Sequence, residues 1–300
     1  MTEKKRVIAL GFFDGVHLGH SALMRRVIEI AGSNSLTPSV ITFDTHPLGT
    51  VSGSLVPLIN SHEDRTGIIH REFGIDNIIL LHFDSATAAM PWDRFIDHLI
   101  AEFHAHYLVA GFDFRFGSGG SGNSRLLKHR CAELGVGCEI VPEVKYDGIS
   151  VSSTYIRDLI TEGNIERANE FLGRPHILTD VVRYGYRLGS TLGTPTINMC
   201  FTTGVLIPAF GVYATRVYPE DGSDHIGVTN IGVRPTVDSS GQITAETHIL
   251  DYHGNLYGRQ VRIGFHKRLR PEMKFNNTND LKEQIRQDCS SAMRYFQNGA

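Results

Sequence analysis

The first half of the chain alternates short apolar runs with stretches of helical period. In the helical stretches apolar residues recur every three or four positions, whereas the runs between them have the length and composition of strands. The predicted strands are residues 7–12, 39–43, 77–83, 106–112 and 138–141, and the predicted helices are residues 20–32, 62–74, 92–103 and 124–135. This alternation predicts right-handed βαβ units and a parallel sheet, whose ligands bind outside the carboxyl ends of the strands.

The first predicted helix has a well-defined apolar face. Leu23, Val27, Ile28 and Ala31 fall on one side of it and predict the face that is buried against the sheet. Gly32 follows this stripe and is expected to end the helix in a left-handed conformation.

The pattern changes after Gly173-Arg174-Pro175. The segments beyond this point are short, rich in β-branched residues and separated by Gly, Pro, Asp and Asn, which is typical of an antiparallel sandwich or barrel. They are residues 177–186, 211–218, 225–233, 244–250 and 260–265. Apolar residues at helical spacing from about Asn279 predict one terminal helix. We therefore expect an α/β domain over residues 1–173 and a β domain with a C-terminal helix over residues 174–300.

Composition excludes several classes of protein. Hydrophobic residues make up 41% and charged residues 20% of the chain, which is a globular composition and not that of a disordered protein. The net charge of −3 offers no broad electrostatic attraction to nucleic acid or to an acidic membrane. No apolar run approaches the ~18 residues of a membrane span, and the four cysteines form no CxxC pair. These features predict a cytoplasmic, reduced protein that binds neither nucleic acid nor membrane.

A candidate phosphate site lies where the first predicted strand meets the first predicted helix. Residues 10–20 read LGFFDGVHLGH, with His17 and His20 three positions apart at the start of the helix. A helix N-terminus exposes unpaired N–H groups and the positive end of the helix dipole, both of which favour phosphate. His17 and His20 are expected to donate hydrogen bonds to nucleotide phosphates, and Gly19 lets a flat base approach the backbone. Two ordinary surface histidines are the alternative interpretation.

A second candidate element opens another helix at residues 152–157, which read SSTYIR. Hydroxyl groups and an arginine at a helix N-terminus suit a triphosphate, although Ser and Thr there also serve as plain helix caps. Residues 117–122 read GSGGSG and formally satisfy GxGxxG, but they follow the fourth predicted strand and are better interpreted as a loop. The sequence contains no GxxxxGK[ST] motif, so it predicts no P-loop.

HLGH together with SSTYIR resembles the nucleotidyltransferase superfamily, and longer strings narrow the resemblance. They occur in the order found in prokaryotic bifunctional riboflavin kinase/FAD synthetases and cover nearly the whole chain. The strings are GFFDGVHLGH (11–20), TFDTHP (42–47), GFDFRFG (111–117), SSTYIR (152–157), LGTPTIN (192–198), ETHILDY (246–252) and LRPEMKF (269–275). The resemblance implies a Rossmann-like nucleotidyltransferase domain, then a six-stranded antiparallel β-barrel riboflavin kinase domain with a C-terminal helix.

The resemblance also implies roles for individual residues. In the first domain His17 and His20 contact the ATP phosphates, and the nucleotide site also takes in Gly11, Phe12, Phe13, Gly19, Asp113, Ser153, Thr154 and Arg157. In the barrel, Gly193 belongs to the ATP loop, Thr196 and Asn198 help to hold Mg²⁺, Glu246 is the catalytic base and Arg270 lies near the flavin. The implied substrates are riboflavin, FMN and ATP.

Seen without the family, the barrel residues would attract no attention. Glu246 would be an acidic residue on the solvated face of a strand, and Thr196 and Asn198 would be turn residues after Pro195. The chain also departs from the family pattern in the barrel, at Ser190, Thr194 and Ile197.

Three other functions stay open at this stage. The first is an FMN adenylyltransferase whose barrel only binds flavin. The second is a non-catalytic sensor of flavin or nucleotide. The third is an enzyme of the same superfamily with another phosphate substrate.

Overall fold

The computed structural model describes residues 4–45, 56–184, 195–233 and 242–299. Internal contacts divide the chain into two compact units, Met1–Ser153 (unit 1) and Thr154–Ala300 (unit 2). Helices α7 (Ser153–Glu162) and α8 (Ile165–Leu172) therefore pack almost entirely within unit 2. The boundary between functional domains at residues 173 and 174 stays a prediction.

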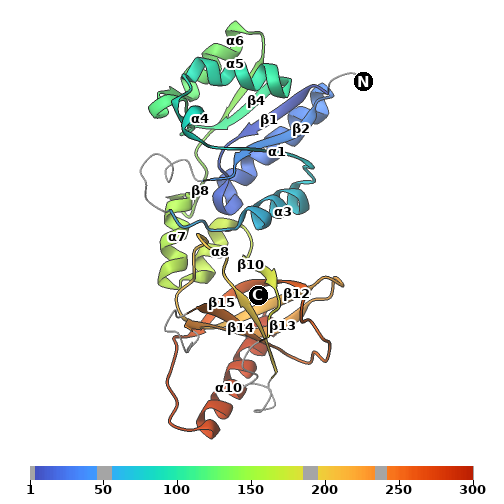
Figure 1. Cartoon of the computed structure of the whole chain (residues 1–300), viewed down its shortest axis with the longest axis vertical. Helices are drawn as coiled ribbons and strands as arrows, with labels where there is room; N and C mark the ends of the chain where they lie inside the picture. Colours follow the sequence, from blue (N-terminus) through green and yellow to red (C-terminus); the bar gives the residue numbers. More distant parts are fainter. Residues whose placement is uncertain (1–3, 46–55, 185–194, 234–241, 300) are drawn as a thin grey trace. The chain divides into compact units, whose positions relative to one another are not determined.

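Unit 1 is built on a five-stranded parallel sheet in the order β3-β2-β1-β4-β7, of which Figure 1 labels β1, β2 and β4. The strands are β1 (Arg6–Leu10), β2 (Thr37–Phe43), β3 (Asn77–Leu81), β4 (Ala105–Gly111) and β7 (Gly137–Val141). The longer helices are α1 (Leu18–Asn34), α3 (His62–Phe73), α5 (Trp92–Phe103) and α6 (Ser124–Glu133), and α4 (Ser85–Ala89) is a short addition. The predicted parallel α/β sheet is confirmed.

Both faces of this sheet are covered. Ile8 and Leu10 of β1 belong to one apolar cluster with Phe95, Leu99 and Leu127 of helices α5 and α6. The alternate residues of β1 point to the other face, because successive side chains of a strand point in opposite directions, and α1 contacts β1 there. A strand buried on both faces reads as a continuous apolar run, which is why VIAL is apolar throughout.

The end of α1 and one position of its buried face differ from the prediction. The helix continues through Gly32 to Asn34, and Ser35 ends it in the left-handed conformation with φ 52° while its N–H bonds to the Ala31 carbonyl. Leu23, Val27 and Ala31 are buried as expected, but Ile28 is 38% exposed and Met24 is buried in its place. A glycine inside a helix can be tolerated where its neighbours pack well, so Gly32 did not mark the end.

Unit 2 contains a curled six-stranded antiparallel sheet in the order β10-β15-β12-β13-β14-β11 (Figure 1). The strands are β10 (His176–Val181), β11 (Thr196–Cys200), β12 (Gly211–Pro219), β13 (His225–Val233), β14 (Ile243–Ile249) and β15 (Gln260–Arg270). A bridge between Arg183 and Asn198 brings the segment after β10 to the opposite edge strand. The predicted barrel-like sheet and terminal helix, α10 (Thr278–Gln297), are confirmed.

The two faces of the second sheet have different neighbours. Val212, Ala214 and Val228 pack on Ala292 of α10. Alternate residues on β12, β13 and β14 face the interior of the curled sheet, and Thr215, Thr229 and Thr247 among them are fully buried. Among the described residues no helix is both long enough and apolar enough to cross a membrane.

Candidate active sites

The predicted phosphate site of unit 1 lies on a tight turn between β1 and α1. Three of its four residues from 13 to 16 have a positive φ, namely Phe13 with φ 58°, Gly15 with φ 77° and Val16 with φ 41°. A left-handed conformation costs a non-glycine residue of order 1–3 kcal/mol, and a β-branched residue adopts it rarely. Such strain is retained where the surrounding structure fixes it, which points to a functional turn.

His17 and His20 meet at the start of α1. The Nδ1 atom of His17, the N-cap residue, accepts a hydrogen bond from the backbone N–H of His20 at 3.3 Å. The two imidazole rings are stacked with their centroids 3.6 Å apart, and the ring of Phe13 meets His20 edge-on at 5.2 Å. A Cβ atom on Gly19 would approach the His17 ring to 3.1 Å, so glycine makes room for this stack. In neutral His17 an accepting Nδ1 places the ring proton on Nε2 as a donor.

Buried polar groups hold the turn in place. The Phe12 carbonyl accepts hydrogen bonds from the Thr42 hydroxyl at 2.8 Å and from Arg65 Nη1 at 3.0 Å. Arg65 is 1% exposed, lies 4.4 Å from the centroid of the Phe12 ring, and its Nη2 also donates to the Phe43 carbonyl. Burial lowers the pKa of Arg65, while the charge of Asp14 opposes that shift. The carboxylate of Asp14 in turn accepts from the Ile59 N–H at 2.9 Å.

Sequence reasoning missed Arg65, Thr42 and Asp14 as supports of the site. One signal was available, because Arg65 lies three and four positions before Ile68 and Ile69, on the buried face of α3. A charged residue at a core position requires a partner, and its partners are the carbonyl groups of Phe12, just after β1, and of Phe43, the last residue of β2.

The remaining predicted residues of unit 1 lie at the same edge of the sheet. Gly11, Phe12 and Phe13 follow β1, and exposed Asp113 follows the neighbouring strand β4, where the Phe114 N–H closes a turn on Gly111. The sheet order reverses between β1 and β4, and this is the position at which nucleotides bind in open α/β sheets. The Ser153 hydroxyl donates to the Asp14 carbonyl at 2.9 Å and so joins this turn. Thr154 and Arg157 begin α7 in unit 2, and their place at the nucleotide stays a prediction.

Unit 2 contains a cavity of about 260 Å³ between the sheet and α10. Its lining includes three of the residues predicted from the sequence, Thr196, Glu246 and Arg270. The other lining residues are Val212, Val228, Asn230, His248, Glu272, Met273, Phe275, Leu281, Ile285 and Asp288. The strands explain this convergence through their register.

Strand pairing places one residue from each of five strands in a single row. Asn198 of β11 pairs with Glu246 of β14, which pairs with Asn230 of β13. Asn230 pairs with Val212 of β12, which pairs with Arg270 of β15. Directly opposed residues of an antiparallel sheet point to the same face, so a carboxylate, two amides and a guanidinium share one surface.

The residues predicted as magnesium ligands lie in a strand and not in a turn. Thr196 and Asn198 are two apart on β11 and therefore point to the same face, with Ile197 pointing to the other. Asn198 is 5% exposed, and its Oδ1 accepts no hydrogen bond from the described residues. His248 Nδ1 donates to the Pro195 carbonyl at 2.9 Å and anchors the start of β11. Gly193, Ser190 and Thr194 lie outside the described residues.

Arg270 is held by a carboxylate that the sequence interpretation did not single out. Asp288 of α10 accepts from Arg270 Nη2 at 2.8 Å and is 4% exposed. Its position carried a signal, because it falls at core spacing between Leu281, Ile285 and Ala292 of an otherwise apolar stripe. Asn230 and His248 carried no comparable signal, since polar residues alternate with apolar ones along any half-buried strand.

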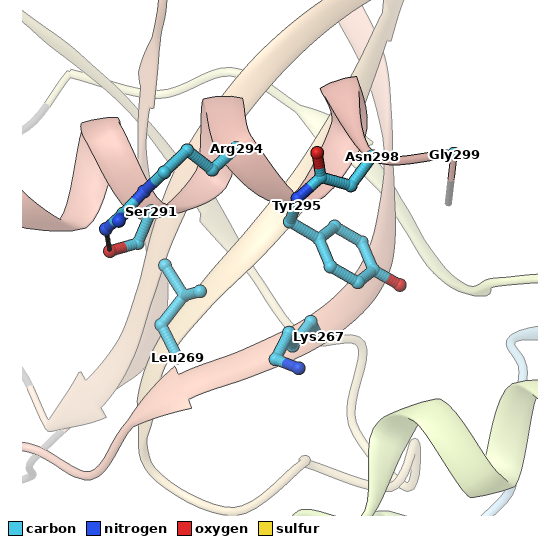
Figure 2. A pocket seen from close by; sticks show the side chains of 7 residues that line it. All are labelled: Lys267, Leu269, Ser291, Arg294, Tyr295, Asn298 and Gly299. Atoms are coloured by element: carbon cyan, nitrogen blue, oxygen red, sulfur yellow. Dashed lines mark hydrogen bonds between the residues drawn. The ribbon is translucent and has the colours of Figure 1, made fainter.

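A second cavity of unit 2, of about 630 Å³, contains none of the predicted residues. Figure 2 shows Lys267 and Leu269 of β15 facing Ser291, Arg294, Tyr295, Asn298 and Gly299 from the end of α10. The Arg294 side chain is directed toward Ser291 and away from Tyr295, and Lys267 is paired with Glu166 at 2.9 Å. The cations of this cavity therefore do not converge on a common point.

Comparison with known proteins places both units in enzyme families. The family model described as FAD synthetase matches residues 1–155, and the model described as riboflavin kinase matches residues 172–296. A protein named bifunctional riboflavin kinase/FMN adenylyltransferase from Listeria monocytogenes is 34% identical, covering 98% of this chain and 94% of its own. Its counterpart from Bacillus subtilis is 34% identical, with 99% and 94% covered, and that from Escherichia coli K12 is 33% identical, with 97% and 92% covered.

A solved structure shares the fold over the same length. It is the crystal structure of a protein named as a macrolide-efflux protein from Streptococcus pneumoniae, with a TM-score of 0.87 and 29% identity, covering 98% of this chain and 95% of that chain. The two family models and the near full-length relatives agree on both units. The chain therefore belongs to the family of bifunctional riboflavin kinase/FMN adenylyltransferases, which are transferases of flavin cofactor biosynthesis.

Proposed function

We propose that unit 2 phosphorylates riboflavin to FMN, that unit 1 adenylylates FMN to FAD, and that ATP is the co-substrate of both steps. The observation that carries this proposal is the cavity of unit 2, where Thr196, Glu246 and Arg270 meet although they are far apart in the sequence. Family membership supports both activities. The free thiols of all four cysteines fit the predicted cytoplasmic location.

In unit 2 the reaction needs a base for a hydroxyl nucleophile. The ribityl hydroxyl oxygen attacks the γ-phosphorus of ATP, its proton passes to the Glu246 carboxylate, and ADP leaves. Glu246 is half-buried on the cavity face of β14. Asn230 and Asn198 flank it on the neighbouring strands, where their amides are placed to hydrogen-bond the substrates.

The residues of β11 fit a magnesium ion. Mg²⁺ prefers hard oxygen ligands, and the Thr196 hydroxyl and the Asn198 carbonyl oxygen are such groups. The Asn198 Oδ1 is buried and accepts no hydrogen bond within the described chain, so it has a lone pair for a cation. When bound, Mg²⁺ neutralises phosphate charge and orients the phosphates.

In unit 1 the nucleophile is already ionised and needs no base. A phosphate oxygen of FMN attacks the α-phosphorus of ATP, and pyrophosphate leaves as the new phosphate–phosphate bond forms. The N–H groups at the start of α1 and the imidazoles of His17 and His20 are placed to stabilise the developing charge. Positioning and charge stabilisation are sufficient for such a step.

Separation of the flavins by chromatography tests both assignments. Purified protein is incubated with MgATP and either riboflavin or FMN, with chelator added to one sample and excess Mg²⁺ restored to another. We expect FMN and then FAD from riboflavin, FAD from FMN, and no product in chelator until Mg²⁺ returns. Riboflavin left unchanged while FMN becomes FAD would overturn the kinase assignment and support an adenylyltransferase with a flavin-binding barrel. No turnover of either flavin would favour a sensor.

A further inference from the structure

The ion pair between Arg270 and Asp288 is closely packed and largely shielded from water. Arg270 Nε donates to both carboxylate oxygens of Asp288 at 3.1 Å, and Nη2 donates to Oδ2 at 2.8 Å. The two side chains are 16% and 6% exposed. Gln284 Nε2, one turn earlier on α10, donates to Asp288 Oδ1 at 3.0 Å. Asp288 is thus fixed from two sides, and it fixes Arg270 in turn.

This pair lies at the cavity and not beside it. Arg270, the last residue of β15, ends the cross-strand row that contains Glu246. Asp288 lines the same cavity together with Leu281 and Ile285 of α10.

The hydrogen bonds of Arg270 leave two of its N–H groups in defined directions. Nε and one N–H of Nη2 bind Asp288, and one N–H of Nη1 binds the Pro271 carbonyl at 3.0 Å. Each terminal nitrogen of a guanidinium carries two hydrogens, so none of these bonds uses the second N–H of Nη1 or of Nη2. Because the group is planar and held on one edge, both are fixed in its plane.

We propose that Asp288 is a positioning residue for the kinase step, which presents Arg270 as a fixed, charge-balanced donor of hydrogen bonds to riboflavin. The carboxylate offsets the guanidinium charge, so the pair suits a neutral acceptor, such as the carbonyl oxygens of the flavin ring, better than an anion. Riboflavin is uncharged and carries such carbonyl groups. This inference rests on the proposed kinase function of unit 2.

Steady-state kinetics of the kinase step in the full-length Asp288→Asn variant test the proposal. The amide has nearly the shape of the carboxylate but lacks its charge and accepts at only one oxygen, so Arg270 loses its fixed orientation. We expect the KM for riboflavin to rise roughly tenfold to a hundredfold, with kcat changed far less. FAD formation from supplied FMN reports folding and activity of unit 1 in the same sample and should be unchanged. Glu283→Gln is the matched control, because Glu283 lies on the same helix but pairs with Arg286 at the surface.

The outcomes separate the positioning role from the function on which it rests. Wild-type protein that makes no FMN contradicts the proposed kinase function itself. Wild-type protein that makes FMN, with an Asp288→Asn variant that only melts earlier and keeps its KM, overturns the positioning role. Where Asp288→Asn fails to fold, Arg270→Lys replaces it, since lysine keeps the charge pair but lacks the planar group. The same rise in KM is then expected, and an unchanged KM overturns the proposal.

Discussion

The two candidate sites are built in opposite ways. In unit 1 the site is a strained backbone turn at the end of a parallel sheet, and its defining groups are N–H donors and two stacked imidazoles. In unit 2 the site is a set of side chains on the face of an antiparallel sheet, aligned by strand register across β11, β14, β13, β12 and β15. One site is made mainly by a loop, and the other by the pairing of strands.

This difference matches the chemistry proposed for each unit. A phosphate nucleophile arrives ionised, so unit 1 only has to bind and neutralise phosphates, for which backbone N–H groups at a helix N-terminus suffice. A hydroxyl nucleophile must lose a proton, so unit 2 requires a carboxylate held in one orientation, which a strand in a paired sheet provides. A catalytic base is therefore expected in unit 2, where the nucleophile is a hydroxyl group, and not in unit 1, where it is a phosphate.

The largest loss of activity is expected for Glu246→Gln, in the kinase step of unit 2. The amide cannot accept the hydroxyl proton, so FMN formation from riboflavin should fall by roughly 10²–10⁴-fold. FAD formation from supplied FMN should stay at the wild-type rate, which also shows that unit 1 of the variant is folded. Both rates are read by chromatographic separation of the flavins, and a kinase rate within a few-fold of wild type would remove Glu246 from its role as base.

His20→Ala should affect the adenylylation step of unit 1 and not the kinase step of unit 2. Loss of one imidazole donor at the start of α1 is expected to slow FAD formation from FMN by roughly 10²–10³-fold, the usual scale for one oxyanion-type donor. FMN formation in unit 2 should not change. His129→Ala is the control, because His129 is an exposed histidine of the same unit, with a side chain 70% exposed. Equal losses of both activities in folded protein would mean that the two sites are not independent.

The fold was largely predictable because its signals are local. The alternation of apolar runs and helical stretches located the five parallel strands and the four longer helices of unit 1. Strand β11 was missed because Gly, Thr and Pro before it read as a loop, and only pairing with Glu246 and its neighbours makes residues 196–200 a strand. The end of α1 was misplaced because Ser35, and not a glycine, adopts the left-handed conformation.

Residues of the candidate sites were predictable only where they belong to a recognisable sequence motif. HLGH identified a helix start by itself, but Glu246 alone looked like a surface residue, and its place in the cavity comes from three strands that are far apart in sequence. Arg65 and Asp288 fall at core spacing in their helices, but their partners are carbonyl groups and side chains brought in by tertiary packing. Spacing along the chain therefore indicates that these residues are buried, but it does not identify their partners.

A prediction on pH dependence concerns unit 2. His176 is 1% exposed, neither of its ring nitrogens has a hydrogen-bond partner in the described chain, and burial lowers its pKa to about 4. Between pH 6.5 and 4 the unfolded chain binds a proton at His176 that the folded chain does not, so the free energy of unfolding falls as pH falls. The loss from this residue approaches roughly 3 kcal/mol near pH 4 and is absent above pH 7.

Denaturant unfolding of wild type and His176→Phe at a series of pH values measures this contribution. Phenylalanine keeps the stacking on Phe265, whose ring centroid lies 5.8 Å away, but does not titrate. The variant should therefore lose less stability on acidification than wild type. His253→Phe, at an exposed position of the same unit, should not reduce the loss. If the free energy of unfolding fell equally with pH in wild type and His176→Phe, His176 would have the same pKa in the folded and the unfolded chain, which would contradict the prediction.

The smallest effect is expected on the interior face of the second sheet, where a substitution should lower stability without changing the kinase site on the other face. On the interior face, Thr229 Oγ1 lies 2.9 Å from the hydroxyls of both Thr215 and Thr247, and all three residues are fully buried. Thr229→Val preserves the shape but removes the central hydroxyl, so two buried hydroxyls lose a partner, at a cost of about 1–3 kcal/mol in the free energy of unfolding. Thr215→Val removes only an end of this chain of hydroxyls and should cost less.

Because the cavity lies on the other face, the KM for riboflavin should stay unchanged in both variants. A KM that rose in step with the loss of stability would show that the interior hydroxyls also set the register on which the kinase site depends.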